Sequence, residues 1–215
     1  MGLERIECKD REDCLAAREK IGVGASEVAA ICGMSPWMTS MDLWRLKTGK
    51  DKPKDLSDNA AVQQGVRMEP ALREFFKALH PEFQIEYHAF DILRQDERPH
   101  FFATLDGELV DTNGRRGILE IKTCTPKGKE GWDQWADGKM KPAYYCQVMA
   151  QLLATGYDFA YLFAALYSMN GDITLKEYSI DREDVKDDLE WVKNKQDEFW
   201  RYVETNTFPP LSLSL

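Results

Sequence analysis

Three side chains in the middle of the chain have the types and spacing of a metal-assisted hydrolytic site. Asp106 precedes the triplet Glu120-Ile121-Lys122. Residues two apart on a strand point to the same face, so Glu120 and Lys122 would project together. Carboxylate oxygens are the ligands that Mg²⁺ prefers, and the bound ion polarises a phosphoryl oxygen and lowers the pKa of a water ligand. With Lys122 orienting or deprotonating that water and offsetting developing negative charge, the set would suit phosphodiester hydrolysis.

The same residues have a plainer interpretation that they alone leave open. Asp106-Gly107 resembles a hairpin turn, and Glu-x-Lys on an exposed strand is often a surface ion pair. The neighbours Ile118, Leu119 and Ile121 are apolar, however, and predict a mostly buried strand. Charges on a buried strand need partners, and a metal ion is a natural one.

Length and charge limit the classes of protein that fit. The 215 residues predict one domain over 1–215, with a core over about 15–180 and a C-terminal helix and tail over 181–215. The net charge of −9 excludes binding of nucleic acid through a broad basic surface. A nucleic-acid role would need metal ions or a local patch. The candidate patch is the segment 115–142, with seven basic and four acidic residues, although ordinary solvated charge explains it equally well.

Cysteine usage and hydropathy indicate a soluble protein of a reducing compartment. The five cysteines form no CxxC pair, which argues against a disulfide framework, a zinc ribbon and an iron–sulfur cluster. The longest apolar run, 159–169, is too short to span a bilayer, and the N-terminus lacks a signal sequence. We therefore expect a cytoplasmic protein without membrane contact. GxGxxG, P-loop and GxSxG motifs are absent, so an intracellular metabolic enzyme has no supporting motif.

The elements that must position the three side chains follow from hydrophobic periodicity. Helices are predicted over 11–20, 25–32, 40–48, 59–79, 143–155 and 185–203, and strands over 83–87, 90–92, 101–105, 108–110, 117–123, 157–167 and 173–180. Pro70 predicts a kink or a new helix start within 59–79. This order predicts an α/β fold with a mixed β-sheet flanked by helices.

Further motifs accompany the central residues. They are Ile21-Gly-Val-Gly-Ala-Ser-Glu27, Thr48-Gly49, Gly65 with Met68-Glu69, Thr104-Leu-Asp-Gly107, Leu119-Glu-Ile-Lys-Thr123 and Pro142-Ala-Tyr-Tyr-Cys-Gln147. In this order and spacing, over about 15–170, the chain resembles the YqaJ-type viral recombinase (lambda exonuclease) family of the PD-(D/E)xK nuclease superfamily. The resemblance implies a restriction-endonuclease-like core.

The resemblance also implies roles for individual residues. Asp106 and Glu120, helped by the carbonyl of Ile121, would ligate Mg²⁺, with two ions per site and Mn²⁺ as a substitute. Lys122 would position the attacking water. Glu69 matches the acidic residue of the first core helix, which reaches the metal site directly or through water.

Other residues are assigned to substrate by the same resemblance or by position. Gln147 matches the glutamine of the extended motif, and Gln151 lies one turn further on. Arg18 and Ser26 resemble the residues that receive a terminal 5′-phosphate, although Ser26 could instead be an N-cap. Lys127 and Lys129 are candidate phosphate contacts or parts of a solvated loop.

Apolar groups could separate the strands of a duplex. Val62, Trp37, Met34 and Met38 are candidates for such a wedge by position, with core packing as the alternative. The three histidines, His80, His88 and His100, lack the spacing of a zinc site and are read as structural or solvent-facing.

The family acts as a 5′→3′ exonuclease on double-stranded DNA ends, releasing mononucleotides and leaving 3′ single-stranded tails. The resemblance therefore implies that activity, a homotrimeric ring, a single-strand annealing protein as partner, and a phage or prophage origin. Three alternatives stay open. One is another PD-(D/E)xK endonuclease, the second is a junction resolvase, and the third is a non-catalytic DNA-end-binding recombination protein.

Overall fold

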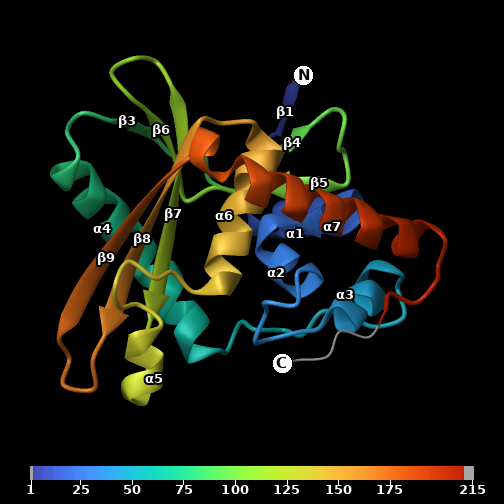
Figure 1. The fold of residues 1–215 in the computed structure, drawn as a ribbon, viewed down its shortest axis with the longest axis horizontal. Helices are drawn as coiled ribbons and strands as arrows, with labels where there is room; N and C mark the ends of the chain where they lie inside the picture. The colour runs from blue at the N-terminus through green and yellow to red at the C-terminus, as the bar shows by residue number, and fades with distance from the viewer. Residues whose placement is uncertain (1, 211–215) are drawn as a thin grey trace.

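Two mixed β-sheets form the frame of the computed structural model, which describes residues 2–210 (Figure 1). The strands are β1 (Leu3–Ile6), β2 (Val23–Gly24), β3 (Gln84–Glu86), β4 (Ile92–Gln95), β5 (Phe101–Ala103), β6 (Gly107–Val110), β7 (Arg116–Cys124), β8 (Phe159–Tyr167) and β9 (Ile173–Asp181). The first sheet has the order β1-β4-β5-β2, and the second has the order β3-β6-β7-β8-β9. The predicted α/β class with mixed pairing is confirmed.

Helices cover both faces of the second sheet. The α-helices are α1 (Arg11–Ile21), α2 (Val28–Ile31), α3 (Ser40–Lys47), α4 (Ala60–Leu79), α5 (Gly128–Asp133), α6 (Pro142–Thr155) and α7 (Lys186–Glu204), with 3₁₀ turns η1 (Ala25–Glu27) and η2 (Arg182–Val185). None of the described helices is long and apolar enough to cross a membrane.

Alternation along β7 decides which side chains face which helix. Leu119 and Ile121 pack with Leu72 and Phe76 of α4. Ile118 packs on the other face, in the cluster that contains residues of α6. Because side chains alternate along a strand, Glu120 and Lys122 share the α6 face with Ile118. The connection from β7 through α6 leads into β8, which pairs with β7 in parallel.

Local signals explain most helix boundaries. The Asn59 side chain accepts hydrogen bonds from the backbone N–H groups of Ala61 and Val62, which starts α4. Gly33, with a φ of +71°, follows the end of α2, where a left-handed glycine commonly ends a helix. The helix α4 continues through Pro70 to Leu79, so the expected new helix start at Pro70 is wrong. Packing of Leu72 and Phe76 against the sheet holds the helix together there.

The two Xaa-Gly pairs beside β6 have different structures. Asn113-Gly114 joins β6 and β7 as an antiparallel hairpin, with Gly114 at a φ of +80°. Asp106-Gly107 is not a hairpin turn, because β5 belongs to the first sheet and β6 to the second. Asp106 therefore lies at the corner where the chain passes from one sheet to the other. The strand β1 and the short helix α5 were not predicted from the sequence.

Candidate active site

The Asp106 side chain is held by β7 at the point where the pairing of β6 with β7 stops. The pairing of β6 with β7 reaches Gly107 opposite Leu119 and goes no further. The next backbone N–H on that edge of β7 belongs to Ile121, and it donates to Oδ2 of Asp106 at 2.7 Å. The carbonyl of Ile121 points to the same side of the strand as its N–H. The Asp106 carboxylate and the Ile121 carbonyl thus lie on the same edge of β7, just before the first residue of β6.

Glu120 is held by two amides from α6. Nε2 of Gln147 donates to Oε1 of Glu120 at 2.6 Å, and Nε2 of Gln151 donates to Oε2. Gln147 and Gln151 are one helical turn apart, so both face β7. Nζ of Lys122 lies 2.5 Å from Oε1 of Glu120. Glu120 is 2% exposed, and its partners satisfy a carboxylate that burial alone would destabilise.

Glu69 reaches the site from the opposite helix. It lies on α4 and accepts a hydrogen bond at 2.5 Å from NH2 of Arg73, one turn further on. A pocket of about 260 Å³ opens between α4, β7 and α6. Its walls are formed by Gly65, Val66, Glu69, Thr104, Asp106, Glu120, Ile121, Lys122, Thr123 and Gln147. The structure therefore brings together all five residues predicted to be catalytic, and the carbonyl-bearing residue Ile121.

The site has more negative than positive charge at its centre. Burial and the charge of Glu120 raise the pKa of Asp106 well above its ordinary value. Burial also raises the pKa of Glu69, despite the nearby guanidinium of Arg73. Burial alone would lower the pKa of Lys122, but the carboxylates of Glu120 and Asp106 outweigh it and raise that pKa. Lys122 thus holds its proton more strongly than a free lysine, which favours orienting a water over deprotonating it.

The donor set fits a hard divalent cation. Carboxylates and a carbonyl supply the oxygen ligands that Mg²⁺ prefers. Burial, and after it the charge of Glu120, raises the pKa of Asp106, and a bound cation would favour its ionised form. Within residues 2–210, no three side chains of His, Cys, Asp or Glu gather closely enough to hold a metal by themselves. Such a site would use waters and substrate oxygens for the remaining positions, as Mg²⁺ sites commonly do.

Arg18 and Ser26 lie near each other beside the corner. The strands β2 and β5 are parallel, so Ser26 after β2 and Thr104 after β5 leave the first sheet at the same edge. A Cβ on Gly24 would lie 3.3 Å from NH2 of Arg18, which puts the guanidinium beside the start of η1. Ser26 is exposed and lies inside η1, whose N-cap is Gly24, so the N-cap interpretation of Ser26 is wrong. Neither Arg18 nor Ser26 lines the pocket.

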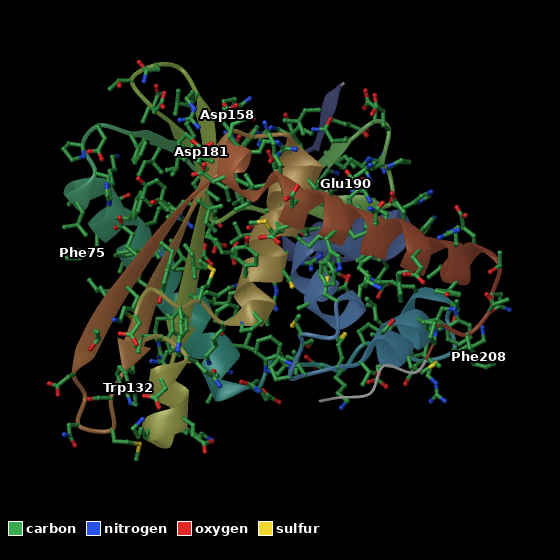
Figure 2. All side chains as sticks on the ribbon, viewed as in Figure 1. Phe75, Trp132, Asp158, Asp181, Glu190 and Phe208 are labelled. Atoms are coloured by element: carbon green, nitrogen blue, oxygen red, sulfur yellow. The ribbon has the colours of Figure 1, made fainter. Side chains whose placement is uncertain are left out.

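The predicted basic segment does not converge on the pocket. Lys127 caps α5 without a side-chain hydrogen bond, and Lys129 forms an exposed ion pair with Asp133 at 2.5 Å. At the other end of β7, Arg115 pairs with Asp181 at 2.5 Å and Arg116 pairs with a buried glutamate. Figure 2 shows Asp181 at this end of the sheet, beside Asp158. Of the basic residues of this segment, only Lys122 lines the pocket.

Two of the wedge candidates lie near the pocket. Trp37 is 66% exposed, and its ring centroid is 6.2 Å from that of Tyr144. Nζ of Lys122 lies 5.3 Å from the same Tyr144 ring, so Tyr144 links Trp37 to the pocket residue Lys122. Val62 is half-buried on α4, one turn before the pocket residue Val66. Met34 is 45% exposed, whereas Met38 packs against the core.

Sequence reasoning missed Arg73 and Val66, and it gave Thr104 no role beyond its place in the motif Thr104-Leu-Asp-Gly107. Arg73 follows Glu69 at the i, i+4 spacing of helical ion pairs, which was a usable signal. Val66 is exposed at the pocket, and nothing in its local pattern marks it. Thr104 contributes its carbonyl to Gln151 at 3.4 Å, a contact that only the folded chain defines.

A family model and solved structures match the chain. The model of the YqaJ-like viral recombinase domain matches residues 13–158. A search of curated proteins gives no match. The fold is similar to that of the alkaline exonuclease LHK-Exo from Laribacter hongkongensis, alone and in complex with dAMP. Each of these two structures has a TM-score of 0.62 and 22% identity, and the match covers 90% of this chain and 95% of that one.

A second solved structure has the same fold. A phage-related exonuclease from Haemophilus somnus 129PT gives a TM-score of 0.53 at 13% identity, with 86% of this chain and 96% of that chain covered. At these identities the likeness shows the fold alone. The fold is therefore that of nuclease-fold exonucleases, as predicted.

Proposed function

Since the chain belongs to the YqaJ-like viral recombinase domain family, we propose that it is a metal-dependent exonuclease that digests double-stranded DNA ends in the 5′→3′ direction. It would release mononucleotides and leave 3′ single-stranded tails. One observation carries the proposal, which is that Asp106, Glu120 and Lys122 line one pocket. LHK-Exo, which has a similar fold, is described as an alkaline exonuclease and was solved with dAMP.

Mg²⁺ is the cofactor that we propose, with two ions per site and Mn²⁺ as a substitute. Asp106, Glu120 and the carbonyl of Ile121 would hold it, with Glu69 on the opposite wall. When bound, the metal would polarise the scissile phosphoryl oxygen and acidify a water ligand.

The protein side chains divide the remaining work. Lys122, held as an ammonium by Glu120, orients the attacking water by hydrogen bonding and offsets charge that develops on the phosphoryl group. Gln147 and Gln151 fix the orientation of the Glu120 carboxylate from α6.

The residues that we propose to contact DNA lie outside the lining of the pocket. Arg18 and Ser26 would receive the terminal 5′-phosphate, because a guanidinium and a hydroxyl beside free backbone N–H groups suit a phosphate. Trp37 and Val62 would contact the end of the duplex as it separates. Lys127 and Lys129 would make weaker phosphate contacts from the start of α5, outside the pocket.

Assembly and partners complete the proposal. We propose a homotrimeric ring around DNA and a single-strand annealing protein that takes up the 3′ tail, in a host-cell cytoplasm with phage or prophage genes. Light scattering of the purified chain tests the ring, and a monomer would contradict it. Co-purification with an annealing protein encoded beside this chain tests the partner.

The decisive experiment follows mononucleotide release from linear duplex DNA, with and without a 5′-phosphate, beside a covalently closed circle and a four-way junction. Reactions contain Mg²⁺ or EDTA, with wild type, Lys122→Ala and, as a matched control, the exposed Lys186→Ala. We expect release from linear ends only, faster with the phosphate, and abolished by EDTA and by Lys122→Ala but not by Lys186→Ala.

Three results would reassign the chain. A cut circle would indicate an endonuclease, and preference for the junction would indicate a resolvase. Binding of ends without metal-dependent release would indicate a non-catalytic recombination protein.

A further inference from the structure

A single buried guanidinium connects the two walls of the pocket. Arg73 of α4 is 8% exposed. Its Nε donates to the backbone carbonyl of Asp106 at 2.5 Å, and its NH2 donates to Oε1 of Glu69 at 2.5 Å. Arg73 thus contacts the helix residue on one wall and the corner residue on the other.

Asp106 is held at both ends as a result. Its carboxylate is bound by the N–H of Ile121 on β7, and its carbonyl is bound by Arg73 on α4. The corner between the two sheets has no strand ladder to position it, because β6 begins only at Gly107. Among the described residues, Arg73 therefore supplies the one side-chain hydrogen bond from α4 to this corner.

The guanidinium of Arg73 stacks on an aromatic ring. Cζ of Arg73 lies 3.4 Å from the centroid of the Tyr87 ring, in the loop that follows β3. A planar guanidinium stacks on an aromatic face and still offers its edge for hydrogen bonds, which an ammonium cannot do. The stack leaves Nε and NH2 directed at Asp106 and Glu69.

We propose that Arg73 is a positioning residue that sets the separation of Glu69 from Asp106 across the pocket. The inference rests on the proposed function. Arg73 does not line the pocket, so it acts through these two residues and touches neither DNA nor metal. Lysine would preserve the charge but could not keep both contacts, because they need two donors in a fixed fork.

The test compares Arg73→Met, Arg73→Lys and Tyr87→Leu with Arg98→Met. Arg98 is a matched control because it also forms several hydrogen bonds, to Gln196, Lys193 and Asp197, but lies away from the pocket. Steady-state hydrolysis of 5′-phosphorylated duplex ends gives kcat and KM. Mn²⁺ titration followed by electron paramagnetic resonance gives metal affinity without turnover, and thermal melting reports folding.

Outer-shell partners of metal ligands typically change affinity or activity by about 10–100-fold when removed. We expect Arg73→Met to lower kcat and Mn²⁺ affinity in that range with KM for DNA changed less than about threefold. Arg73→Lys should recover part of the loss, and Tyr87→Leu should show a smaller loss of the same kind. Arg98→Met should alter the melting temperature only.

Four outcomes would overturn the inference. They are full activity in folded Arg73→Met, full recovery in Arg73→Lys, an effect confined to KM, and an equal loss of kcat in Arg98→Met. If Arg73→Met does not fold, Tyr87→Leu decides, since unchanged kcat and Mn²⁺ affinity in that variant would contradict the role of the stack. Failure of the proposed function is distinct, because wild type itself would then release no nucleotide.

Discussion

The carboxylate of Asp106 accepts a hydrogen bond from the backbone N–H of Ile121 at 2.7 Å, where β7 extends beyond its pairing with Gly107, the first residue of β6. A side chain here takes the place of a missing strand. The carboxylate of Asp106 consequently lies beside β7 and close to Glu120. Burial makes this position unfavourable for its negative charge. The contact thus joins the geometry of the sheet to the chemistry of the pocket.

We expect Asp106→Asn to stabilise the fold and to abolish nuclease activity. Because the folded-state pKa of Asp106 is raised, its ionised form destabilises the fold once the pH exceeds the ordinary aspartate value of about 3.9. The amide oxygen can still accept from Ile121 without that charge. Activity should fall by more than the roughly 100-fold typical of losing an outer-shell group, because a proposed ligand is removed.

Thermal melting at pH 7 with and without Mg²⁺ checks this prediction. Mg²⁺ should raise the melting temperature of wild type but not of Asp106→Asn, since a ligand stabilises only the state that binds it. The control is Asp111→Asn, because Asp111 also accepts backbone N–H groups, from Asn113 and Arg115, in the hairpin outside the pocket. A lower melting temperature for Asp106→Asn than for wild type would contradict the argument.

Gln151 tests how much the orientation of Glu120 matters. Its Nε2 binds Glu120 and the carbonyl of Thr104, and among the described residues its buried Oε1 has no partner. We expect Gln151→Leu to lower kcat by about 10–100-fold with KM for DNA unchanged, because Gln151 is 0% exposed. Leucine fills a similar volume and removes the unpaired oxygen, but it leaves Oε2 of the buried Glu120 without this donor. We therefore expect the free energy of unfolding to fall by about 1–3 kcal/mol.

A matched variant separates this effect from general repacking. Gln196→Leu replaces another buried glutamine, which lies on α7 away from the pocket. Its Oε1 accepts a hydrogen bond from Arg98. Its kcat should equal that of wild type. Equal kcat for Gln151→Leu and wild type would show that Gln147 and Lys122 orient Glu120 without help.

Local sequence signals predicted the strands and helices that present the site. Alternation put Glu120 and Lys122 on one face of a strand, and the i, i+4 spacing put Gln147 and Gln151 on one face of a helix. Both relations depend only on backbone periodicity, and the structure has both. The burial of the 117–123 strand was readable as well, since Ile118, Leu119 and Ile121 pack on its two faces.

Relations across the chain were not readable in the same way. The carbonyl of Asp106 and the side chain of Arg73 are distant in sequence and meet only because α4 packs on the second sheet. The division into two sheets was also missed, because Asp106-Gly107 has the same local pattern as a hairpin turn. Pro70 pointed to a kink or a new helix start, and no new helix starts there, because α4 runs from Ala60 to Leu79 through Pro70.

The pH dependence of stability should include a contribution from His80. His80 caps α4, and its ring nitrogens lie 2.9 Å from Glu82 and 2.9 Å from Glu177 of β9. Burial alone would lower the pKa of His80, but hydrogen bonds to Glu177 and Glu82 outweigh it and raise that pKa. A raised histidine pKa means that the stabilisation is complete below about pH 6.5 and is lost as pH rises through the folded-state pKa.

Urea unfolding between pH 5.5 and 9 measures this contribution, which we expect to be about 1 kcal/mol or less for a partly exposed ion pair. His80→Gln and Glu177→Gln should each flatten the fall in unfolding free energy over that interval. An unchanged slope in both variants would assign the pH dependence to other groups.

Trp37 should determine how well the enzyme uses a DNA end. Its ring is 66% exposed and stands beside Tyr144, which lies next to Lys122, so a base of the terminal nucleotide can stack on it. Stacking of a base on an aromatic side chain contributes about 1–3 kcal/mol, so Trp37→Ala should raise KM for duplex ends by roughly 5–150-fold. The melting temperature should stay near that of wild type, because little of the ring is buried.

Trp191→Ala removes another exposed tryptophan, 44% exposed on α7, and should leave KM unchanged. Kinetics on 5′-phosphorylated linear duplex check both variants, and equal KM values for Trp37→Ala and Trp191→Ala would remove Trp37 from the path of the DNA.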